Sequence, residues 1–197
     1  LAAMAVSGVL GWAFERIVVR PVYGQHLKQI LITTGGLIVA EQLLKVIWGP
    51  EQITLTRPEA LRGAFLLGDI AVEKYRVLAV VIGLAVFAAL SLTLNRTRIG
   101  LLIRAGVENG EMVEALGYRI RRLFVGVFVA GSALAGLGGA MWGLYQEVVT
   151  AAIGGQVIVL VFIVIIIGGL GSVGGCFVGA LLVGLTANYV GFLAPKV

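Results

Sequence analysis

The sequence predicts an all-α protein, a polytopic bundle of transmembrane helices, and three observations lead to this prediction. Of its 197 residues, 59% are hydrophobic and 13% are charged, whereas charged residues make up about a quarter of an ordinary globular domain. Long apolar runs alternate with charged segments. The 29 glycines fall largely in the apolar runs, as in membrane bundles, where small residues let helix backbones approach closely. A soluble protein would need an exterior of charged side chains that this chain lacks.

We assign six apolar runs to the membrane, as spans of a single partial transmembrane domain. The runs are residues 1–14, 29–48, 77–94, 123–145, 157–168 and 174–193. The first is too short to cross, because a helix of this length rises about 21 Å and the hydrocarbon core is about 30 Å thick. We interpret it as the back end of a span and expect both ends of the chain to be truncated. A signal peptide is the alternative, but a basic start and a cleavage site are missing.

The run Val157–Ile167 is rich in β-branched residues, which could indicate a strand. An open strand in a bilayer would leave its backbone groups unpaired, so a helix is favoured. We expect a short or discontinuous helix that ends at the Gly-rich segment 168–175. This segment has neither the lysine nor the spacing of a phosphate-binding loop. The sequence therefore predicts no ATP site and no cofactor in this chain.

Lysine and arginine in the loops predict the orientation. Segment 15–29 contains three basic residues and segment 95–122 contains six, whereas basic and acidic residues balance in segment 49–76. Two spans separate the basic segments, so we expect both loops on the cytoplasmic side and 49–76 on the extracytoplasmic side of a bacterial or archaeal inner membrane. His26 would then be a solvated residue of a cytoplasmic loop. The net charge of +5 is a topology signal and does not indicate nucleic-acid binding.

The stretch 109–117 within the second basic segment predicts a short helix. Asn109 can cap its start, the carboxylate of Glu111 suits the positive helix end, and Gly117 fits the position just past its end. Its apolar face would consist of Met112, Val113 and Leu116. A two-turn helix is marginal alone in water and needs a surface to pack on. One candidate for that surface is the helix bundle or the membrane surface, and the other is a groove in a cytoplasmic partner. Positive charge on both sides of an acidic helix favours the partner.

Small residues recur every four positions in two of the predicted helices. They are Gly131, Ala135, Gly139 and Gly143, and then Gly171, Gly175 and Gly179. Ridges of this kind allow close helix crossings, so helix packing is the first interpretation. The alternative is a lining of the solute path or a hinge for alternating access.

Polar residues inside the spans are candidates for the solute path. Glu41 and Lys45 lie four apart and can pair, either as a self-neutralising interfacial pair or as a polar patch near the solute entry. Thr33, Thr34 and Gly35 lie nearer mid-span, where glycine could open the backbone and hydroxyls could hold a zwitterion. The single cysteine, Cys176, is expected to be a small buried hydrophobe. No metal cluster can be built around it and the single histidine.

Several motifs occur in order along nearly the whole chain. They are Glu15-Arg16, Arg20-Pro21, Trp48-Gly49-Pro50, Thr97-Arg98-Ile99-Gly100, Arg104-Ala105, Glu114-Ala115-Leu116-Gly117, and the Gly-rich stretches 131–139 and 168–175. In these motifs the chain resembles the branched-chain amino acid ABC transporter permease family, the inner-membrane subunits of leucine/isoleucine/valine-type importers. Members of that family are longer at both ends.

The resemblance implies a function and a set of partners. It implies a coupling helix that sits in a cleft of an ATP-binding subunit, formed by Glu111, Met112, Val113, Glu114, Ala115, Leu116 and Gly117. It also implies a second permease subunit, two cytoplasmic ATP-binding subunits and an extracytoplasmic solute-binding protein, with ATP bound by the partners and no enzymatic activity in this chain. A urea or short-chain amide permease is the alternative of the same superfamily. A secondary transporter would require an ion-coupling carboxylate at mid-membrane, and Glu41 lies off-centre beside Lys45.

Overall fold

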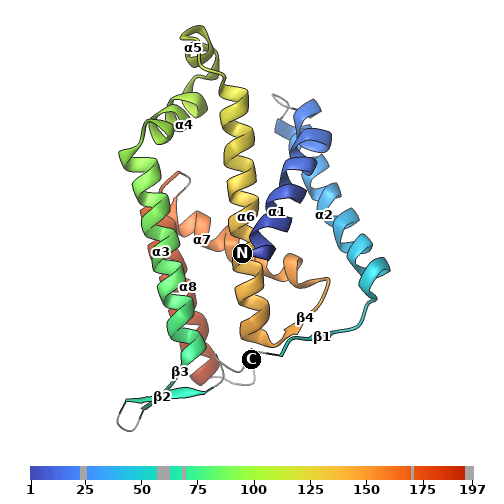
Figure 1. Ribbon diagram of the computed structural model, residues 1–197, viewed down its shortest axis with the longest axis vertical. Coiled ribbons are helices and arrows are strands. Elements are labelled where there is room, and N and C mark those ends of the chain that lie inside the picture. The colour runs from blue at the N-terminus through green and yellow to red at the C-terminus, as the bar shows by residue number, and fades with distance from the viewer. Residues whose placement is uncertain (23–25, 57–62, 68–69, 170, 194–197) are drawn as a thin grey trace. The chain divides into compact units, whose positions relative to one another are not determined.

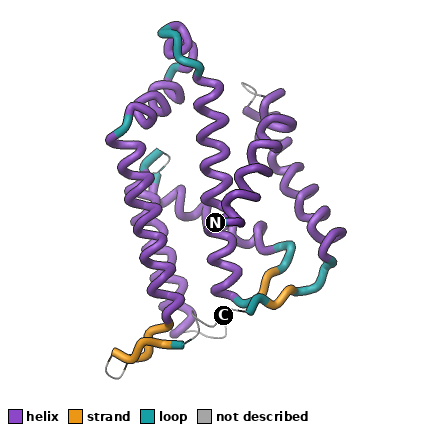
Figure 2. The backbone as a smooth tube through the Cα atoms, viewed as in Figure 1, coloured by secondary structure: helices purple, strands orange, loops and turns teal. Residues whose placement is uncertain are grey.

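The computed structural model describes residues 1–22, 26–56, 63–67, 70–169 and 171–193. The chain forms two compact units, the first made of residues 1–79 and 98–151 and the second of residues 80–97 and 152–197. Helices make up most of both units, which confirms the predicted all-α class (Figures 1 and 2). Within these described ranges, five helical segments are long and apolar enough to cross a membrane.

The first unit contains most of the helices. They are α1 (Ala2–Phe14), the π-helix η1 (Glu15–Val19), the 3-10 helix η2 (Arg20–Val22), α2 (His26–Trp48), α4 (Arg98–Glu108), α5 (Gly110–Ala115) and α6 (Ile120–Gln146). The helix α3 (Lys74–Arg96) begins in this unit and continues into the second. The second unit also contains α7 (Ile153–Gly168) and α8 (Val173–Leu193).

The packing of α1 against α6 forms the centre of the first unit (Figure 1). Small residues on both helices allow this close approach. A β-carbon added at Gly136 would lie 2.8 Å from the carbonyl oxygen of Ala3 and would also collide with Ser7. A β-carbon at Gly11 would collide with Ser132. Any side chain at these glycines would therefore push the two helices apart.

The ridge predicted on α6 is not the one that contacts α1. Gly131, Ala135 and Gly139 are exposed, and among the described residues no atom lies within 4 Å of a β-carbon built at either glycine. Only Gly143 at the end of that row packs closely, against Val149 and Leu55. The sequence of α6 carries several stripes of small residues, and the rotation of the helix about its axis decides which stripe meets α1.

The first span was predicted to end at Phe14. Its helical path instead continues through η1 and η2 to Val22. The resulting segment Ala2–Val22 has 21 residues and is one of the five candidate spans. The predicted loop 15–29 is correspondingly shorter, because α2 begins at His26. The loop was predicted from its charged residues alone. Glu15 is instead only 1% exposed and lies inside the unit.

Two short antiparallel ribbons, which the sequence analysis did not predict, occur in the first unit (Figure 2). The strand β1 (Ile53–Thr54) pairs with β4 (Val148–Val149), and β2 (Ala64–Leu67) forms a hairpin with β3 (Ile70–Glu73). The first ribbon joins segments about a hundred residues apart, a pairing that no local pattern announces. Residues 57–62 and 68–69 of the predicted loop 49–76 lie outside the described residues.

The second unit is organised by the hairpin of α7 and α8. The helix α7 ends where Gly169 adopts a φ of +82°, which confirms the predicted short helix ending at the glycines. A β-carbon at Gly179 would lie 2.9 Å from the carbonyl oxygen of Val164, and one at Gly175 would collide with Gly168. Gly171 does not extend this packing row, because it lies in the connecting turn with a φ of +91°. Leu170 of the predicted glycine motif lies outside the described residues.

Candidate functional site

The short helix α5 has both of the predicted end signals. The side-chain Oδ1 of Asn109 accepts a hydrogen bond from the backbone N–H of Met112 at 3.1 Å, as expected of a capping residue. At the other end Gly117 has a φ of +87° and donates to the carbonyl of Glu114. The N–H of Tyr118 donates to the carbonyl of Val113. This pair of bonds is a Schellman motif, which a glycine in the left-handed region permits.

The larger apolar side chains at α5 are one buried residue and two exposed residues. Val113 is 6% exposed, whereas Met112 is 65% and Leu116 is 72% exposed. Val113 and α5 pack next to the start of α6, where Ile120 is also buried. Met112 and Leu116 stand beside the exposed carboxylates of Glu111 and Glu114. The helix therefore presents an apolar and acidic surface that the rest of the first unit leaves uncovered.

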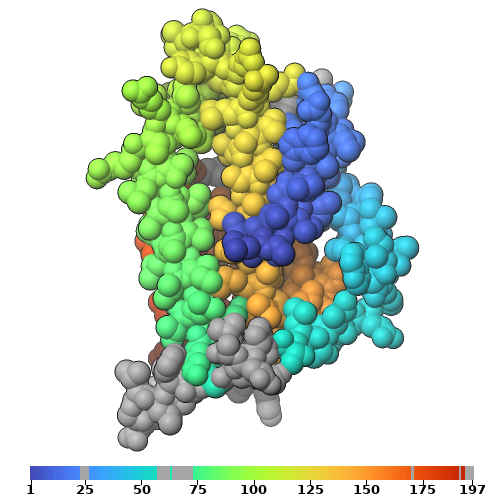
Figure 3. Space-filling view, in the orientation of Figure 1, coloured from blue at the N-terminus to red at the C-terminus, as the bar shows by residue number. Residues whose placement is uncertain are grey.

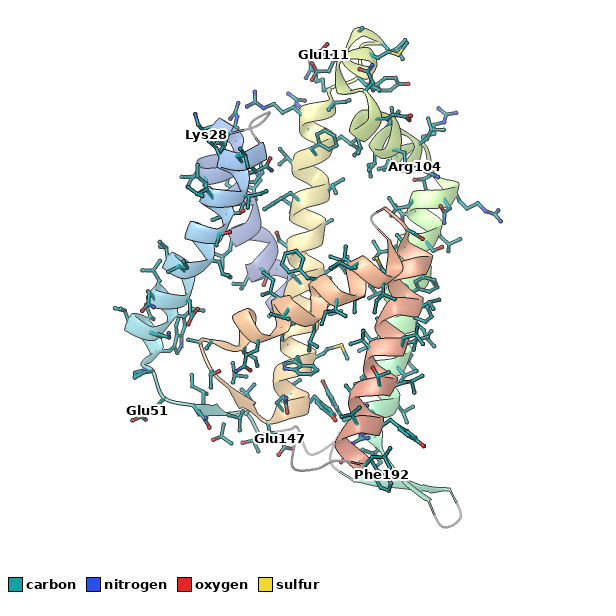
Figure 4. All side chains as sticks on the ribbon, turned by 180° about the vertical axis from the view of Figure 1, so that it is seen from behind. Lys28, Glu51, Arg104, Glu111, Glu147 and Phe192 are labelled. Atoms are coloured by element: carbon teal, nitrogen blue, oxygen red, sulfur yellow. The ribbon has the colours of Figure 1, made fainter. Side chains whose placement is uncertain are left out.

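The helix α5 lies at one end of the first unit, together with basic residues. The helix projects beyond the ends of α1 and α2 in the space-filling view (Figure 3). Lys28, Arg104 and Glu111 lie at this end, and Glu51 and Glu147 lie at the opposite end (Figure 4). Residues from both basic segments of the sequence thus lie at the end that bears α5.

The predicted solute-path residues lie along α2, where the glycines do not open the backbone. The helix is continuous from His26 to Trp48. The hydroxyl of Thr33 donates to the carbonyls of Gln29 and Ile30 at 2.8 and 3.0 Å, and that of Thr34 donates to Ile30 at 2.9 Å. These bonds keep the hydroxyls on their own helix. The neighbouring glycines do not break the helix, and one of them packs against α1.

That packing glycine is Gly36, where an added β-carbon would lie 2.6 Å from the ring of Phe14. Gly35 makes no comparable contact within the described part of the chain. Further along α2, Glu41 and Lys45 form the predicted ion pair, with Oε1 and Nζ 2.7 Å apart and both side chains about a third exposed or less. The pair neutralises itself within one helix turn, which fits the interfacial interpretation.

Two features of the first unit were not predicted from the sequence. The carboxylate of Glu15 is buried, and its Oε1 has no hydrogen-bond partner in the described part of the structure. At the opposite end of the unit, the hydroxyl of Tyr75 donates to the carbonyl of Met141 at 2.5 Å, and the guanidinium of Arg76 lies over the ring of Tyr145. Aromatic side chains of this kind are typical of a membrane interface. An acidic residue within an apolar run was the only signal for Glu15.

The apolar exterior and the five long apolar helical segments define a multi-pass α-helical membrane protein. A sequence profile described as the branched-chain amino acid transport system / permease component matches residues 1–196. The chain belongs to this family.

Curated relatives match over most of the chain. The high-affinity branched-chain amino acid transport system permease protein BraD of Pseudomonas aeruginosa is 28% identical over 193 residues, which cover 95% of this chain and 62% of that protein. The permease protein LivH of the corresponding system of Escherichia coli K12 is 25% identical over 189 residues, or 93% of this chain and 61% of that protein. The chain thus spans about three-fifths of the length of these relatives. No solved structure matches.

Proposed function

We propose that this chain is a membrane-spanning permease subunit of an ABC importer that moves branched-chain or related amino acids across the inner membrane. The observation that carries the proposal is α5, a capped helix at the basic end of the first unit that exposes Met112 and Leu116 together with the carboxylates of Glu111 and Glu114. An exposed apolar surface rimmed by charge is typical of a protein-binding site. Membership of the permease family and the names of BraD and LivH as branched-chain amino acid permeases support the amino acid solute.

The proposal divides the work between this chain and its partners. Residues 111–117 would be the coupling helix, seated in a cleft of an ATP-binding subunit on the cytoplasmic side. Two such subunits would bind and hydrolyse ATP, a second permease subunit would complete the path, and an extracytoplasmic binding protein would deliver the solute to the side of Glu51 and Glu147. Thr33, Thr34, Gly35 and Glu41 remain candidates for the path.

The direct test is uptake into proteoliposomes that contain the full-length chain, the ATP-binding subunits and the binding protein. We expect ATP-dependent uptake of leucine, isoleucine and valine from a panel that also contains urea and short-chain amides. Uptake of urea without amino acids would move the chain to the amide branch. Uptake driven by an ion gradient without ATP would contradict the importer assignment.

The coupling role has its own variant. Changing Glu114→Lys together with Gly117→Arg reverses a charge on α5 and places a side chain at a φ of +87°, where L residues are strained. We expect ATP hydrolysis to continue while leucine uptake falls about tenfold or more. Normal uptake per ATP hydrolysed in a variant that inserts normally would contradict the assignment of α5.

A further inference from the structure

The carboxylate of Glu15 is the one charged group that the structure buries among the residues it describes. Its neighbours on η1 and η2 include Val19 and Val22, which are also buried. The Oε1 atom has no hydrogen-bond partner in this part of the chain. Buried carboxylates in membrane proteins normally pair with a cation or line a functional path, because leaving one unpaired is costly.

The basic residues nearest in sequence do not supply the missing cation. Arg16 is exposed and its guanidinium lies over the ring of Trp12, 5.7 Å from the ring centre. Arg20 is exposed at the start of η2. Both side chains leave the interior, whereas Glu15 remains in it. Neither arginine is therefore observed to pair with the buried carboxylate of Glu15.

The backbone at Glu15 is also unusual. The residues Glu15–Val19 form a π-helix, in which the N–H of Arg20 donates to the carbonyl of Glu15. Short π-helical segments are rare and occur often at functional sites, since the wider turn changes the direction of the side chains that follow. Here the wide turn begins at the buried carboxylate.

The helix α2 carries a hydroxyl group, that of Thr33, on the face that packs against Phe14. Phe14, next to Glu15, packs on Gly36, and Thr33 lies three residues before Gly36 on the same face of α2. The hydroxyl hydrogen of Thr33 is directed to its own helix, so its oxygen keeps lone pairs for a donor. Thr33 is half-buried and Thr34 is exposed, so Thr33 belongs to the inner face.

From this arrangement we infer that the carboxylate of Glu15, with the hydroxyl oxygen of Thr33, receives the ammonium group of the amino acid while the path is closed around it. The inference rests on the proposed function and adds a specificity residue to it. An ammonium group offers three donors and a positive charge, which matches a carboxylate and a hydroxyl oxygen that can only accept here. A basic side chain of another subunit is the competing source of charge, but the carboxylate lies within the packing of this chain.

Binding to the assembled complex in detergent, without the solute-binding protein, tests the inference. The probes are leucine and 2-hydroxy-4-methylpentanoate, which has a hydroxyl in place of the ammonium group. A ligand that binds the folded state raises the midpoint of thermal unfolding. We expect leucine to raise the midpoint of the unaltered complex and the hydroxy acid to leave it unchanged. Equal shifts with both probes would overturn the inference.

Two variants at Glu15 and one control complete the test. In Glu15→Gln we expect the leucine shift to disappear and ATP-driven leucine uptake to fall about tenfold or more, the loss typical of a charge-assisted hydrogen bond. The control is Glu73→Gln, whose carboxylate is half-exposed and paired with Arg76, and it should keep both. If Glu15→Gln does not fold, Glu15→Asp decides, because its shorter carboxylate should give a smaller leucine shift; an unchanged shift would overturn the inference.

The outcomes separate this inference from the proposed function. Normal leucine binding and uptake in Glu15→Gln would overturn the inference and leave the amino acid importer intact. Dissociation of the permease from another subunit in Glu15→Gln, with the leucine shift unchanged in the intact fraction, would assign the missing cation to that subunit and also overturn it. An unaltered complex that neither binds nor transports any amino acid would overturn the proposed function itself.

Discussion

Individual small residues determine how closely the helices of the first unit approach. Ser7 and Gly136 meet between α1 and α6, and Phe14 meets Gly36 between α1 and α2. Such contacts stabilise helix association through close packing, because lipid is as apolar as a neighbouring helix and the hydrophobic effect does not favour either one. Other glycines, such as Gly139, have no described atom within 4 Å of the position that a β-carbon would take. The two kinds of glycine should respond differently to one added methyl group.

We expect Gly136→Ala to destabilise the chain by about 1–3 kcal/mol, because its methyl group would collide with Ser7 and the carbonyl of Ala3. Gly139→Ala is the matched control on the same helix. It should be neutral or stabilise by up to about 1 kcal/mol, because alanine is the better helix former. Reversible unfolding in mixed micelles measures both. Equal effects of the two substitutions would contradict the observed rotation of α6.

At the scale of elements, α5 is a helix of six residues that depends on its ends. One side-chain hydrogen bond from Met112 to Asn109 and one glycine turn at Gly117 fix its boundaries. Val113 alone anchors it on the first unit, while Met112 and Leu116 stay exposed. A helix this short has little stability of its own. Loss of its cap should therefore reduce the fraction of time for which the exposed surface is correctly formed.

We expect Asn109→Ala to cost α5 about 1 kcal/mol. If α5 transmits the work of an ATP-binding subunit, less solute should then be transported for each ATP hydrolysed. Asn109→Ser is the matched variant, because serine also caps helices and should restore most of the coupling. The measurement is the ratio of leucine uptake to phosphate release in proteoliposomes. A ratio that is unchanged in Asn109→Ala would show that the cap is not needed for coupling.

The whole molecule combines two compact units with an exterior of apolar side chains. In the first unit, the end that bears Lys28, Arg104 and Glu111 lies opposite the end that bears Glu51 and Glu147 (Figure 4). Arginine and lysine collect on the cytoplasmic side of membrane proteins. The geometry therefore favours a cytoplasmic position for α5.

Site-directed labelling tests this orientation. After Cys176→Ala removes the single cysteine, Glu111→Cys and Lys28→Cys should react with a membrane-impermeant maleimide only in inverted vesicles. Glu51→Cys should react only in intact cells or right-side-out vesicles. Labelling of Glu111→Cys from the outside would reverse the topology and remove the basis for an ATP-binding partner at α5.

The sequence by itself determined that the chain lies in a membrane and which local contacts its helices form. An apolar composition with charged loops requires a helical membrane protein, because backbone groups in a bilayer must be paired within their own segment. The cap at Asn109, the turn at Gly117 and the pair of Glu41 with Lys45 were predictable because each involves residues no more than five positions apart.

Only the tertiary structure decided which faces meet. Burial of Glu15, the row of α6 that contacts α1 and the ribbon of β1 with β4 depend on partners far along the chain. Several stripes of small residues have the same local pattern, so helix rotation selects one of them through packing that no sequence window contains. The charge at Glu15 suggested a loop, whereas in the structure Glu15 begins a π-helix that continues α1, and the neighbouring Arg16 lies over the ring of Trp12.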